Sequence, residues 1–266
     1  MPYKTIDFKT FSSFKIGQKE QVLIVEKNDE NLDNFYLIGS CNNTLIGTNP
    51  PPLMMLSKKY NYIKIEDNLL KIGGATPSGK IASFCKKNDI ANFEFLSHLP
   101  GKLGGLVFMN AGLKEYEISN HLVNITLQSG LKQKKQIMFE YRKSNITEII
   151  FEASFELHYG YDISKAVMFK KMRANQPSIP SAGSCFKNPP NDYAGRLIEA
   201  VGLKGKRVGD MEFSIQHANF LVNHNNGTFE DAVTLIDEAQ KKVKDKFEIM
   251  LECEIKILDQ TYGKIP

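Results

Sequence analysis

Gly183-Ser184-Cys185-Phe186-Lys187-Asn188-Pro189 is the most informative stretch of this chain. It places a hydroxyl, an amine and an amide close together, at Ser184, Lys187 and Asn188. The flanking glycine and proline favour a tight loop, because glycine allows unusual backbone angles and proline ends regular structure. Such a loop can present three polar side chains to a polar ligand. A polar turn before a helix has a similar composition, so the run alone leaves both interpretations open.

The composition is that of an ordinary soluble globular protein. Of the 266 residues, 42% are apolar and 24% are charged, which allows a large core and two lobes. The net charge of +4 favours anionic small ligands and does not indicate nucleic-acid binding. The basic run at 241–246 shares a helix with acidic residues, so we interpret it as a solvated face.

Nothing in the sequence indicates a secreted or membrane protein. We expect no signal peptide, and no apolar run approaches the roughly 18 residues of a membrane span. The four cysteines lie far apart without a CxxC pair, which favours a reduced, cytoplasmic compartment. The histidines show neither HxxxH nor HExxH spacing, so we expect no metal site. They are His98, His121, His158, His217 and His224.

Short apolar segments dominate the first part of the chain and predict strands. They are residues 22–25, 35–38, 45–47, 62–65, 70–72, 123–127, 137–139 and 149–157. Thr76-Pro77 predicts the start of a helix.

The last third of the chain changes character. It predicts a short helix at 194–201, a strand at 218–222, a long helix opened by a Thr228–Asp231 capping box, and an alternating strand at 251–258. We therefore expect an α+β protein of two units with a boundary near residues 160–175.

Two glycine-containing segments are candidates for holding phosphate through backbone N–H groups. One is Gly39-Ser40-Cys41-Asn42-Asn43; the other is Pro100-Gly101-Lys102-Leu103-Gly104-Gly105, continuing to Asn110-Ala111-Gly112. Neither matches GxGxxG or GxxxxGK[ST], so a nicotinamide-type Rossmann site and a P-loop are poorly supported. The glycine pair at 104 and 105 can equally serve tight packing.

Charged residues near two strand ends are candidates for catalysis. Tyr141-Arg142 follow an apolar strand, and an arginine there can clamp a carboxylate or stabilise an enolate. Glu252 and Glu254 alternate on the last strand and so share one face, where a carboxylate can handle protons. Each group alone is also typical of a solvated surface.

In their order along the chain, these motifs resemble the UDP-N-acetylenolpyruvoylglucosamine reductases, flavin enzymes of bacterial peptidoglycan synthesis. The resemblance runs from Ser12-Ser13-Phe14-Lys15-Ile16-Gly17 to the last predicted strand, nearly the whole chain. Its most specific parts are Leu99-Pro-Gly-Lys-Leu-Gly-Gly105 with Asn110-Ala-Gly112, and Ser181-Ala-Gly-Ser-Cys-Phe-Lys-Asn-Pro189. Further matches are Leu197-Ile-Glu-Ala-Val-Gly-Leu-Lys-Gly205, Ser214-Ile-Gln-His-Ala-Asn-Phe220 and Leu251-Glu-Cys-Glu-Ile255.

The resemblance implies a two-lobed FAD-binding unit of the vanillyl-alcohol-oxidase type at residues 1–165, with lobes of about 1–60 and 61–165. A C-terminal α+β substrate-binding domain would follow at 166–266. It also implies FAD as cofactor, NADPH as electron donor and UDP-N-acetylglucosamine enolpyruvate as substrate. The protein would be a cytoplasmic monomer that serves cell-wall synthesis, cell shape and cell division.

The resemblance also implies residue roles. Ser184 would donate a proton to the substrate, while Arg142 and Glu254 would stabilise the enolic intermediate. The segments 39–43, 100–105 and 110–112 would contact FAD. The residues expected to contact substrate are Tyr141, Lys187, Asn188, Gln176 and Arg173.

Several positions depart from the family pattern. The family's Gly-Gly-Gly-Ser-Asn turn is Gly39–Asn43 here with two glycines replaced, which predicts weaker FAD binding. His98 stands where the family has glycine, Lys102 where it has a small hydroxyl residue, and Cys253 where it has proline. The short separation of Arg142 from the serine loop predicts the compact second type, without the tyrosine-bearing loop over the substrate.

Two other functions remain open on the sequence. A related flavoprotein oxidase acting on an alcohol or hydroxy acid would keep the FAD segments but would not need Ser184, Arg142 and Glu254. A non-catalytic nucleotide- or peptide-binding protein would need none of them. The presence of all three residues therefore favours the reductase. For Cys185 we expect packing rather than reactivity, because nothing nearby suggests a lowered pKa.

Overall fold

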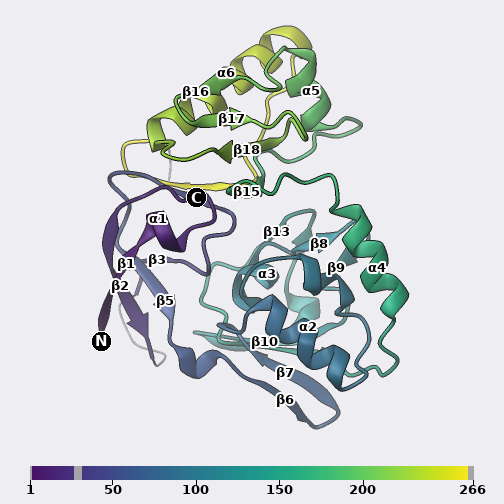
Figure 1. The fold of residues 1–266 in the computed structure, drawn as a ribbon. Coiled ribbons are helices and arrows are strands. Elements are labelled where there is room, and N and C mark those ends of the chain that lie inside the picture. The colour runs from purple at the N-terminus through teal and green to yellow at the C-terminus, as the bar shows by residue number, and fades with distance from the viewer. Residues whose placement is uncertain (1, 27–31, 263–266) are drawn as a thin grey trace. The chain divides into compact units, whose positions relative to one another are not determined.

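The computed structural model describes residues 2–26 and 32–262, and Figure 1 labels its elements. The chain forms two compact units, which are described separately. Unit 1 contains Met1–Tyr3, Leu23–Gly39 and Met54–Ala174. Unit 2 contains Lys4–Val22, Ser40–Leu53 and Asn175–Pro266.

Unit 1 is built on an antiparallel sheet with the strand order β11-β10-β14-β7-β6. Its strands are β6 (Ile63–Glu66), β7 (Leu69–Gly73), β10 (Leu122–Leu127), β11 (Gly130–Gln133) and β14 (Glu152–Glu156). Asp67 and Asn68 connect β6 to β7 with φ of 54° and 57°. Two left-handed residues make the two-residue turn whose twist matches a hairpin, and Asp and Asn tolerate that conformation better than most residues.

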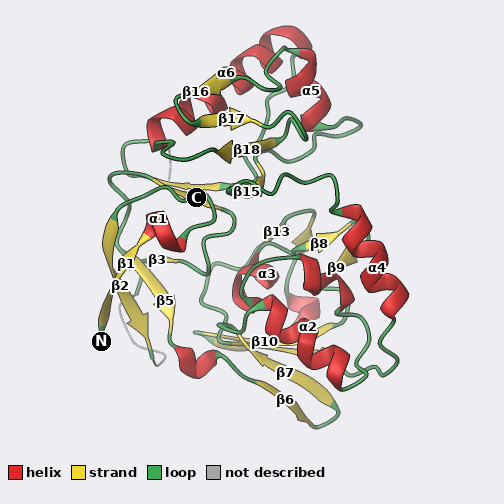
Figure 2. Cartoon of the chain, in the orientation of Figure 1, coloured by secondary structure: helices red, strands yellow, loops and turns green. Residues whose placement is uncertain are grey.

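Helices cover this sheet and complete the core of unit 1 (Figure 2). They are α2 (Ser78–Lys87), η2 (Glu94–His98), α3 (Leu103–Phe108) and α4 (Ile163–Met172). Ile72 of β7, Ile81 of α2 and Val107 of α3 are fully buried in one hydrophobic cluster. Three short elements complete the part of unit 1 near the site: the hairpin β8 (Gly112–Leu113) and β9 (Tyr116–Glu117), the 3₁₀ turn η3 (Lys134–Gln136), and the hairpin β12 (Phe139–Glu140) and β13 (Lys143–Ser144).

Unit 2 packs two helices against a second antiparallel sheet, in the order β15-β18-β17-β16. The elements are β15 (Ser181–Ser184), α5 (Ala194–Ala200), β16 (Arg207–Val208), β17 (Met211–Phe213), β18 (Phe220–Asn223) and α6 (Phe229–Phe247). Thr228 and Asp231 form a capping box that satisfies two N–H groups at the start of α6. The apolar stripe of α6, which includes Leu235, Ile236 and Val243, is fully buried.

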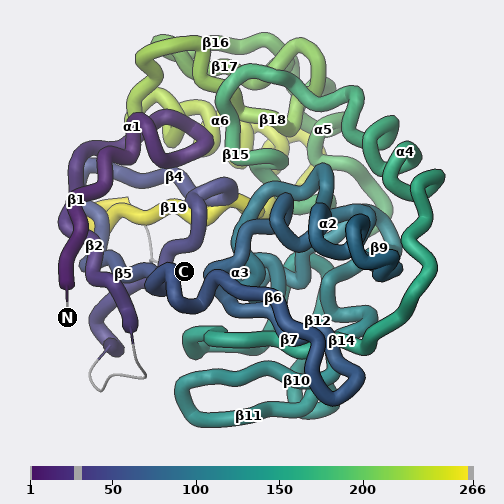
Figure 3. Tube along the Cα trace, turned by 60° about the horizontal axis from the view of Figure 1, so that its bottom comes forward, coloured from purple at the N-terminus to yellow at the C-terminus, as the bar shows by residue number. Residues whose placement is uncertain are grey.

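Two segments of unit 2 that are distant in sequence lie side by side in Figure 3. Strand β19 (Lys256–Leu258) pairs in parallel with β4 (Thr44–Ile46), with Ile257 opposite Leu45. Residues 40–43, immediately before β4, are therefore held next to the start of β19.

The remaining strands form a sheet in the order β1-β2-β5-β3. They are β1 (Tyr3–Asp7), β2 (Lys19–Val25), β3 (Tyr36–Leu37) and β5 (Leu53–Leu56), accompanied by α1 (Phe8–Phe11) and the 3₁₀ turn η1 (Lys58–Tyr60). The chain passes from one unit to the other within β1, β2 and β5. None of the described helices combines the length and the apolarity that crossing a membrane requires.

The predicted α+β class, the capping box and the helix at 194–201 are confirmed. The predicted strand at 251–258 is wrong over its first half, because only Lys256–Leu258 are in a strand. Residues 252–254 instead bond to the segment 185–187 in an irregular pattern. Glu252 and Glu254 consequently differ in environment, the first exposed and the second half-buried.

The helices that were not predicted include α4 and α3. Helix α4 has a weak apolar stripe, because Ile163 and Val167 are exposed and only Phe169 is buried. Helix α3 contains a glycine pair, which disfavours helix in a sequence-based prediction. The two-unit division also differs from the predicted one at 165/166, since α4 belongs to unit 1 and residues 4–22 and 40–53 belong to unit 2.

Candidate active site

The segment 183–189 in unit 2 is held by backbone hydrogen bonds on two sides. On one side Ser184, the last residue of β15, pairs with Phe220 of β18. On the other side the N–H of Glu254 donates to the carbonyl of Cys185 at 2.8 Å, and the N–H of Lys187 donates to the carbonyl of Glu252 at 2.9 Å. Two of the predicted catalytic residues, the serine and the second glutamate, are therefore on adjacent segments of one unit.

Asn219 fixes the middle of this segment. Its side chain accepts from the N–H of Phe186 at 3.0 Å and donates to the carbonyl of Phe186 at 2.8 Å. Its own carbonyl accepts from the N–H of Cys185 at 2.7 Å. Because Asn219 and Phe186 are both buried, these bonds satisfy backbone groups that water does not reach. Asn219 lies within the matching run 214–220, but no signal in the sequence indicated this positioning role.

The polar side chains of this segment have defined partners. The ammonium of Lys187 lies 2.6 Å from a carboxylate oxygen of Glu252, and the side-chain oxygen of Asn188 accepts from the N–H of Ala194 at 3.1 Å. The Lys187 side chain is mostly buried and that of Glu252 is mostly exposed. Glu252 is thus a positioning partner that the sequence did not reveal.

Cys185 is completely buried between these polar residues. Burial raises the pKa of its thiol well above the usual value, and the nearby Cys253 and Glu254 raise it further. The thiol stays protonated and unreactive at neutral pH. The expected packing role is confirmed.

The turn at 40–43 forms without the two missing glycines. Cys41 takes φ of 49°, a left-handed conformation that costs a non-glycine residue about 1–2 kcal/mol. The backbone carbonyl of Cys41 accepts from both the N–H and the hydroxyl of Ser13, at 3.2 and 3.1 Å. The side-chain amide of Asn43 donates to the carbonyl of Glu254 at 3.0 Å, which ties this turn to the 252–254 segment.

The glycines expected to contact FAD divide into two kinds. The N–H of Gly104 donates to Gly74, and an added Cβ at position 104 would lie 3.3 Å from that same carbonyl oxygen. Gly104 therefore serves close packing of α3. An added Cβ at Gly39 or Gly105 would meet no atom within 4 Å. Packing does not require glycine at these two positions, so their backbone is open to a ligand.

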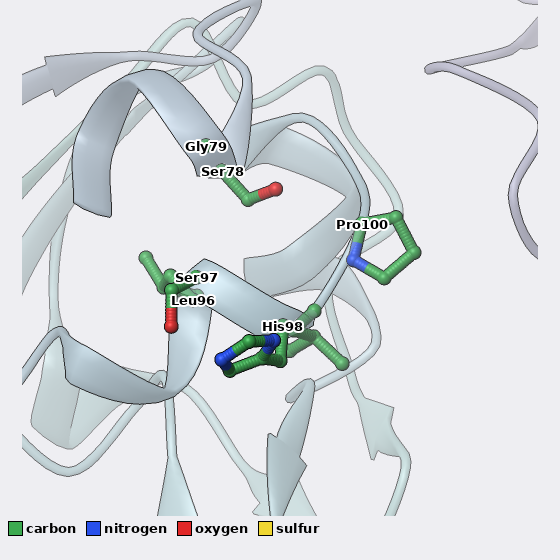
Figure 4. Close-up of a pocket in the computed structure, with 7 residues that line it drawn as sticks. Ser78, Gly79, Leu96, Ser97, His98 and Pro100 are labelled. Carbon is green, nitrogen blue, oxygen red and sulfur yellow. The ribbon is translucent and has the colours of Figure 1, made fainter. Parts of the chain in front are cut away.

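Unit 1 contains a cavity of about 280 Å³ next to Pro100, the first residue of the predicted FAD segment 100–105 (Figure 4). Its lining residues are Ser78, Gly79, Leu96, Ser97, His98, Leu99 and Pro100. In Figure 4 the serine at the start of α2 and the histidine of η2 lie on either side of the cavity. Of the residues predicted to contact FAD, Pro100 lines it. The sequence pointed to His98 only as a departure from the family pattern.

Arg142 occupies a two-residue hairpin loop with Tyr141, between β12 and β13. Its φ is 57°, and its guanidinium donates to the carbonyl of Gly112 at 2.7 Å and lies 5.0 Å from the Tyr141 ring. Asn110 is buried nearby and donates to Glu117 and to the carbonyl of Glu140, at 2.7 and 3.1 Å. The predicted FAD segment 110–112 and the predicted catalytic arginine thus share one corner of unit 1.

Positive charge gathers in the same unit. Arg173, which follows α4, has a lowered pKa because of burial and then because of the charge of Arg142. Burial also lowers the pKa of His98, and the charges of Arg173 and Lys170 lower it further. Mutually repelling cations close together favour an anionic ligand. Gln176 lies instead in unit 2, where its carbonyl accepts from the side chain of Gln216.

Known proteins match this chain over nearly its full length. A UDP-N-acetylenolpyruvoylglucosamine reductase of Campylobacter jejuni is 46% identical over 95% of this chain and 99% of the relative. The enzyme of the same name from Helicobacter hepaticus is 43% identical over 95% of this chain and 98% of the relative. The chain belongs to the UDP-N-acetylenolpyruvoylglucosamine reductase family. The C-terminal domain of that family matches residues 174–258, and the resemblance found in the sequence is confirmed.

The fold agrees with this family. A crystal structure of UDP-N-acetylenolpyruvylglucosamine reductase from Thermus caldophilus superposes with a TM-score of 0.85, covering 97% of this chain and 99% of that one at 24% identity. Within the reductase fold, the predicted catalytic residues Ser184 and Glu254 lie in unit 2, and Arg142 lies in unit 1.

Proposed function

We propose that this chain reduces UDP-N-acetylglucosamine enolpyruvate to UDP-N-acetylmuramate, using FAD and NADPH, as a step of peptidoglycan precursor synthesis. The observation that carries the proposal is membership of the reductase family over almost the whole chain. We further infer a cytoplasmic monomer that supports cell shape and division. We also propose the compact second type, with an open substrate site, because the separation of Arg142 from the serine loop is short.

The residues present fit an FAD. The open backbone at Gly39 and Gly105 supports close approach of a pyrophosphate. The side-chain oxygen of Asn110 is buried and has no hydrogen-bond partner among residues 2–26 and 32–262, so it can accept from a ligand N–H or O–H. The cavity lined by Ser78, His98 and Pro100 supports binding of a nucleotide portion beside them. When bound, FAD supplies hydride transfer from NADPH to the vinyl carbon of the substrate.

The chain's own residues have three tasks in this reaction. Reduction adds a hydride to the terminal vinyl carbon and a proton to carbon 2, so negative charge develops on the substrate carboxylate between the two events. Arg142, fixed by its bond to Gly112, supplies a cation for that charge. We propose that Ser184 donates the proton to carbon 2 and that Glu254 shares a proton with the carboxylate.

The remaining predicted residues would bind and orient the substrate. In unit 2, Glu252 pairs with Lys187, and the side chain of Asn188 accepts from the N–H of Ala194, the first residue of α5. Tyr141 and Arg173 share the corner of unit 1 that carries the positive charge. A substrate with a diphosphate and a carboxylate suits this charge. Gln176, in unit 2, is proposed as a further substrate contact.

Product analysis tests this function. The purified protein with FAD, NADPH and UDP-N-acetylglucosamine enolpyruvate is expected to form one UDP-N-acetylmuramate for each NADPH oxidised, without oxygen consumption. Mass spectrometry would register the gain of two hydrogens in the sugar nucleotide. NADPH oxidation that requires oxygen and leaves the substrate unchanged would contradict the proposal and favour an oxidase.

A further inference from the structure

The antiparallel pairing of β10 with β14 brings together three side chains that are far apart in sequence. His121 lies immediately before β10, Glu156 is the last residue of β14, and His158 follows two residues later. One carboxylate oxygen of Glu156 lies 3.5 Å from Nδ1 of His121 and 3.1 Å from Nε2 of His158. All three atoms lie within 4.8 Å of one another. Spacing along the chain gave no sign of this group.

The backbone around these residues is held on both sides. The N–H of Glu156 donates to the carbonyl of His121 at 2.9 Å, which fixes the cross-strand pair. The carbonyl of His158 accepts from the N–H of Ala91 at 2.9 Å, and the next residue, Tyr159, bridges to Ile90. Glu156 and His158 are two residues apart in extended chain, so they point to the same face. The three groups are therefore positioned by the sheet rather than by a loose surface loop.

We propose that His121, Glu156 and His158 bind a divalent transition-metal ion, with Zn²⁺ as the reference ion. Two imidazoles and one carboxylate are a ligand set that zinc uses when a fourth position is left to water. With metal–ligand distances of about 2.0–2.2 Å, the corners of a tetrahedral site lie roughly 3.3–3.6 Å apart. The distances of 3.1 and 3.5 Å from the Glu156 oxygen to the two imidazole nitrogens are close to two of these corner-to-corner distances. The third pair, the two imidazole nitrogens, lies within 4.8 Å.

Charge and access agree with this assignment. The carboxylate of Glu156 supplies the anionic ligand, and both imidazoles already lie within 3.5 Å of it. The three side chains are exposed or half-buried, which gives an ion a direct path. None of them belongs to the proposed catalytic, substrate or FAD residues. A bound ion would link the start of β10 to the end of β14 and so stabilise unit 1.

The competing interpretation is a pair of ordinary surface ion pairs, which contribute about 0–1 kcal/mol and need no metal. Zinc titration of the full chain, after removal of metal with a chelator, separates the two. We expect one Zn²⁺ per chain in competition with a chromophoric chelator, and visible absorption bands when Co²⁺ is used instead.

Variants locate the site. His121→Ala and His158→Ala should each lose at least the roughly tenfold in affinity that follows even outer-shell changes at metal sites. Both should also lose the rise in Tm that Zn²⁺ gives the unchanged protein. His224→Gln is the matched control, because His224 lies in unit 2 beside Glu212 and should leave zinc binding unaltered. Far-UV circular dichroism checks that each variant folds.

Two results would overturn the proposal. One is equal zinc affinity in the unchanged protein and in a His121→Ala, His158→Ala double variant, which would assign the ion to other groups. The other is no saturable binding of Zn²⁺ or Co²⁺ at neutral pH. Neither result depends on reductase activity, so the metal site and the proposed function fail or stand separately.

Discussion

Replacing Asn219 by alanine tests how the serine loop is held. The change removes the donor and the acceptor that pair with the N–H and carbonyl of Phe186, at 3.0 and 2.8 Å. Phe186 is fully buried and Asn219 nearly so, so water cannot replace both bonds without rearrangement. Each buried backbone group left unsatisfied costs about 1–3 kcal/mol, which gives roughly 2–6 kcal/mol for the pair. That is a large share of the roughly 5–15 kcal/mol that stabilises a typical domain.

Urea unfolding followed by far-UV circular dichroism measures this loss, and Asn226→Ala provides a matched control. Asn226 is exposed, so its variant should stay within about 0.5 kcal/mol of the unchanged protein. A loss below about 1 kcal/mol in Asn219→Ala would refute the argument that these bonds determine the conformation of segment 183–189.

Three further predictions concern the same regions. Ser184→Ala should leave the reduction of FAD by NADPH intact in stopped-flow measurements while slowing reoxidation by substrate at least about 100-fold, the usual scale of general acid catalysis; equal loss in both half-reactions would indicate a structural role. Gly112→Ala should destabilise the fold by about 1–3 kcal/mol, since its Cβ would lie 2.2 Å from a backbone oxygen. Gly105→Ala should instead fold normally and weaken FAD binding in a fluorescence titration. Equal thermal stability of the two variants would contradict this distinction. Because the pKa of Cys185 is raised in the folded state, its contribution to the free energy of unfolding should be fully present below the ordinary thiol pKa of about 8.5 and should be lost as the pH rises above it. Cys185→Ala should lack that part of the pH dependence. Rapid alkylation of the native thiol at pH 8 would contradict its burial.

Local signals in the sequence predicted the local features of the fold. The Thr228–Asp231 spacing predicted the capping box of α6, because both partners lie within one helical turn. The polar run at 183–189 suggested a tight loop from its flanking glycine and proline, but its first two residues are the end of strand β15 (Ser181–Ser184). Helix α4 was not predicted, because it lacks a buried apolar stripe: its apolar side chains at 163 and 167 face solvent.

Features that depend on distant pairing were not predictable. Glu252 and Asn219 reach the serine loop only through the pairing of segments that are distant in sequence within unit 2, so no spacing rule connects them to Lys187 or Phe186. The division of glycines into packing and open positions also required coordinates, since Gly104 and Gly105 are adjacent and identical in the sequence. The prediction that Glu252 and Glu254 share a strand face failed because tertiary bonds replaced the regular ladder there.

The flavin spectrum of the purified, FAD-loaded protein tests the proposed reductase function most directly. We expect anaerobic NADPH to bleach the flavin bands and UDP-N-acetylglucosamine enolpyruvate to restore them without oxygen. Flavin that stays bleached until oxygen is admitted would contradict the reductase and indicate an oxidase. A protein that takes up no FAD would contradict both enzymes.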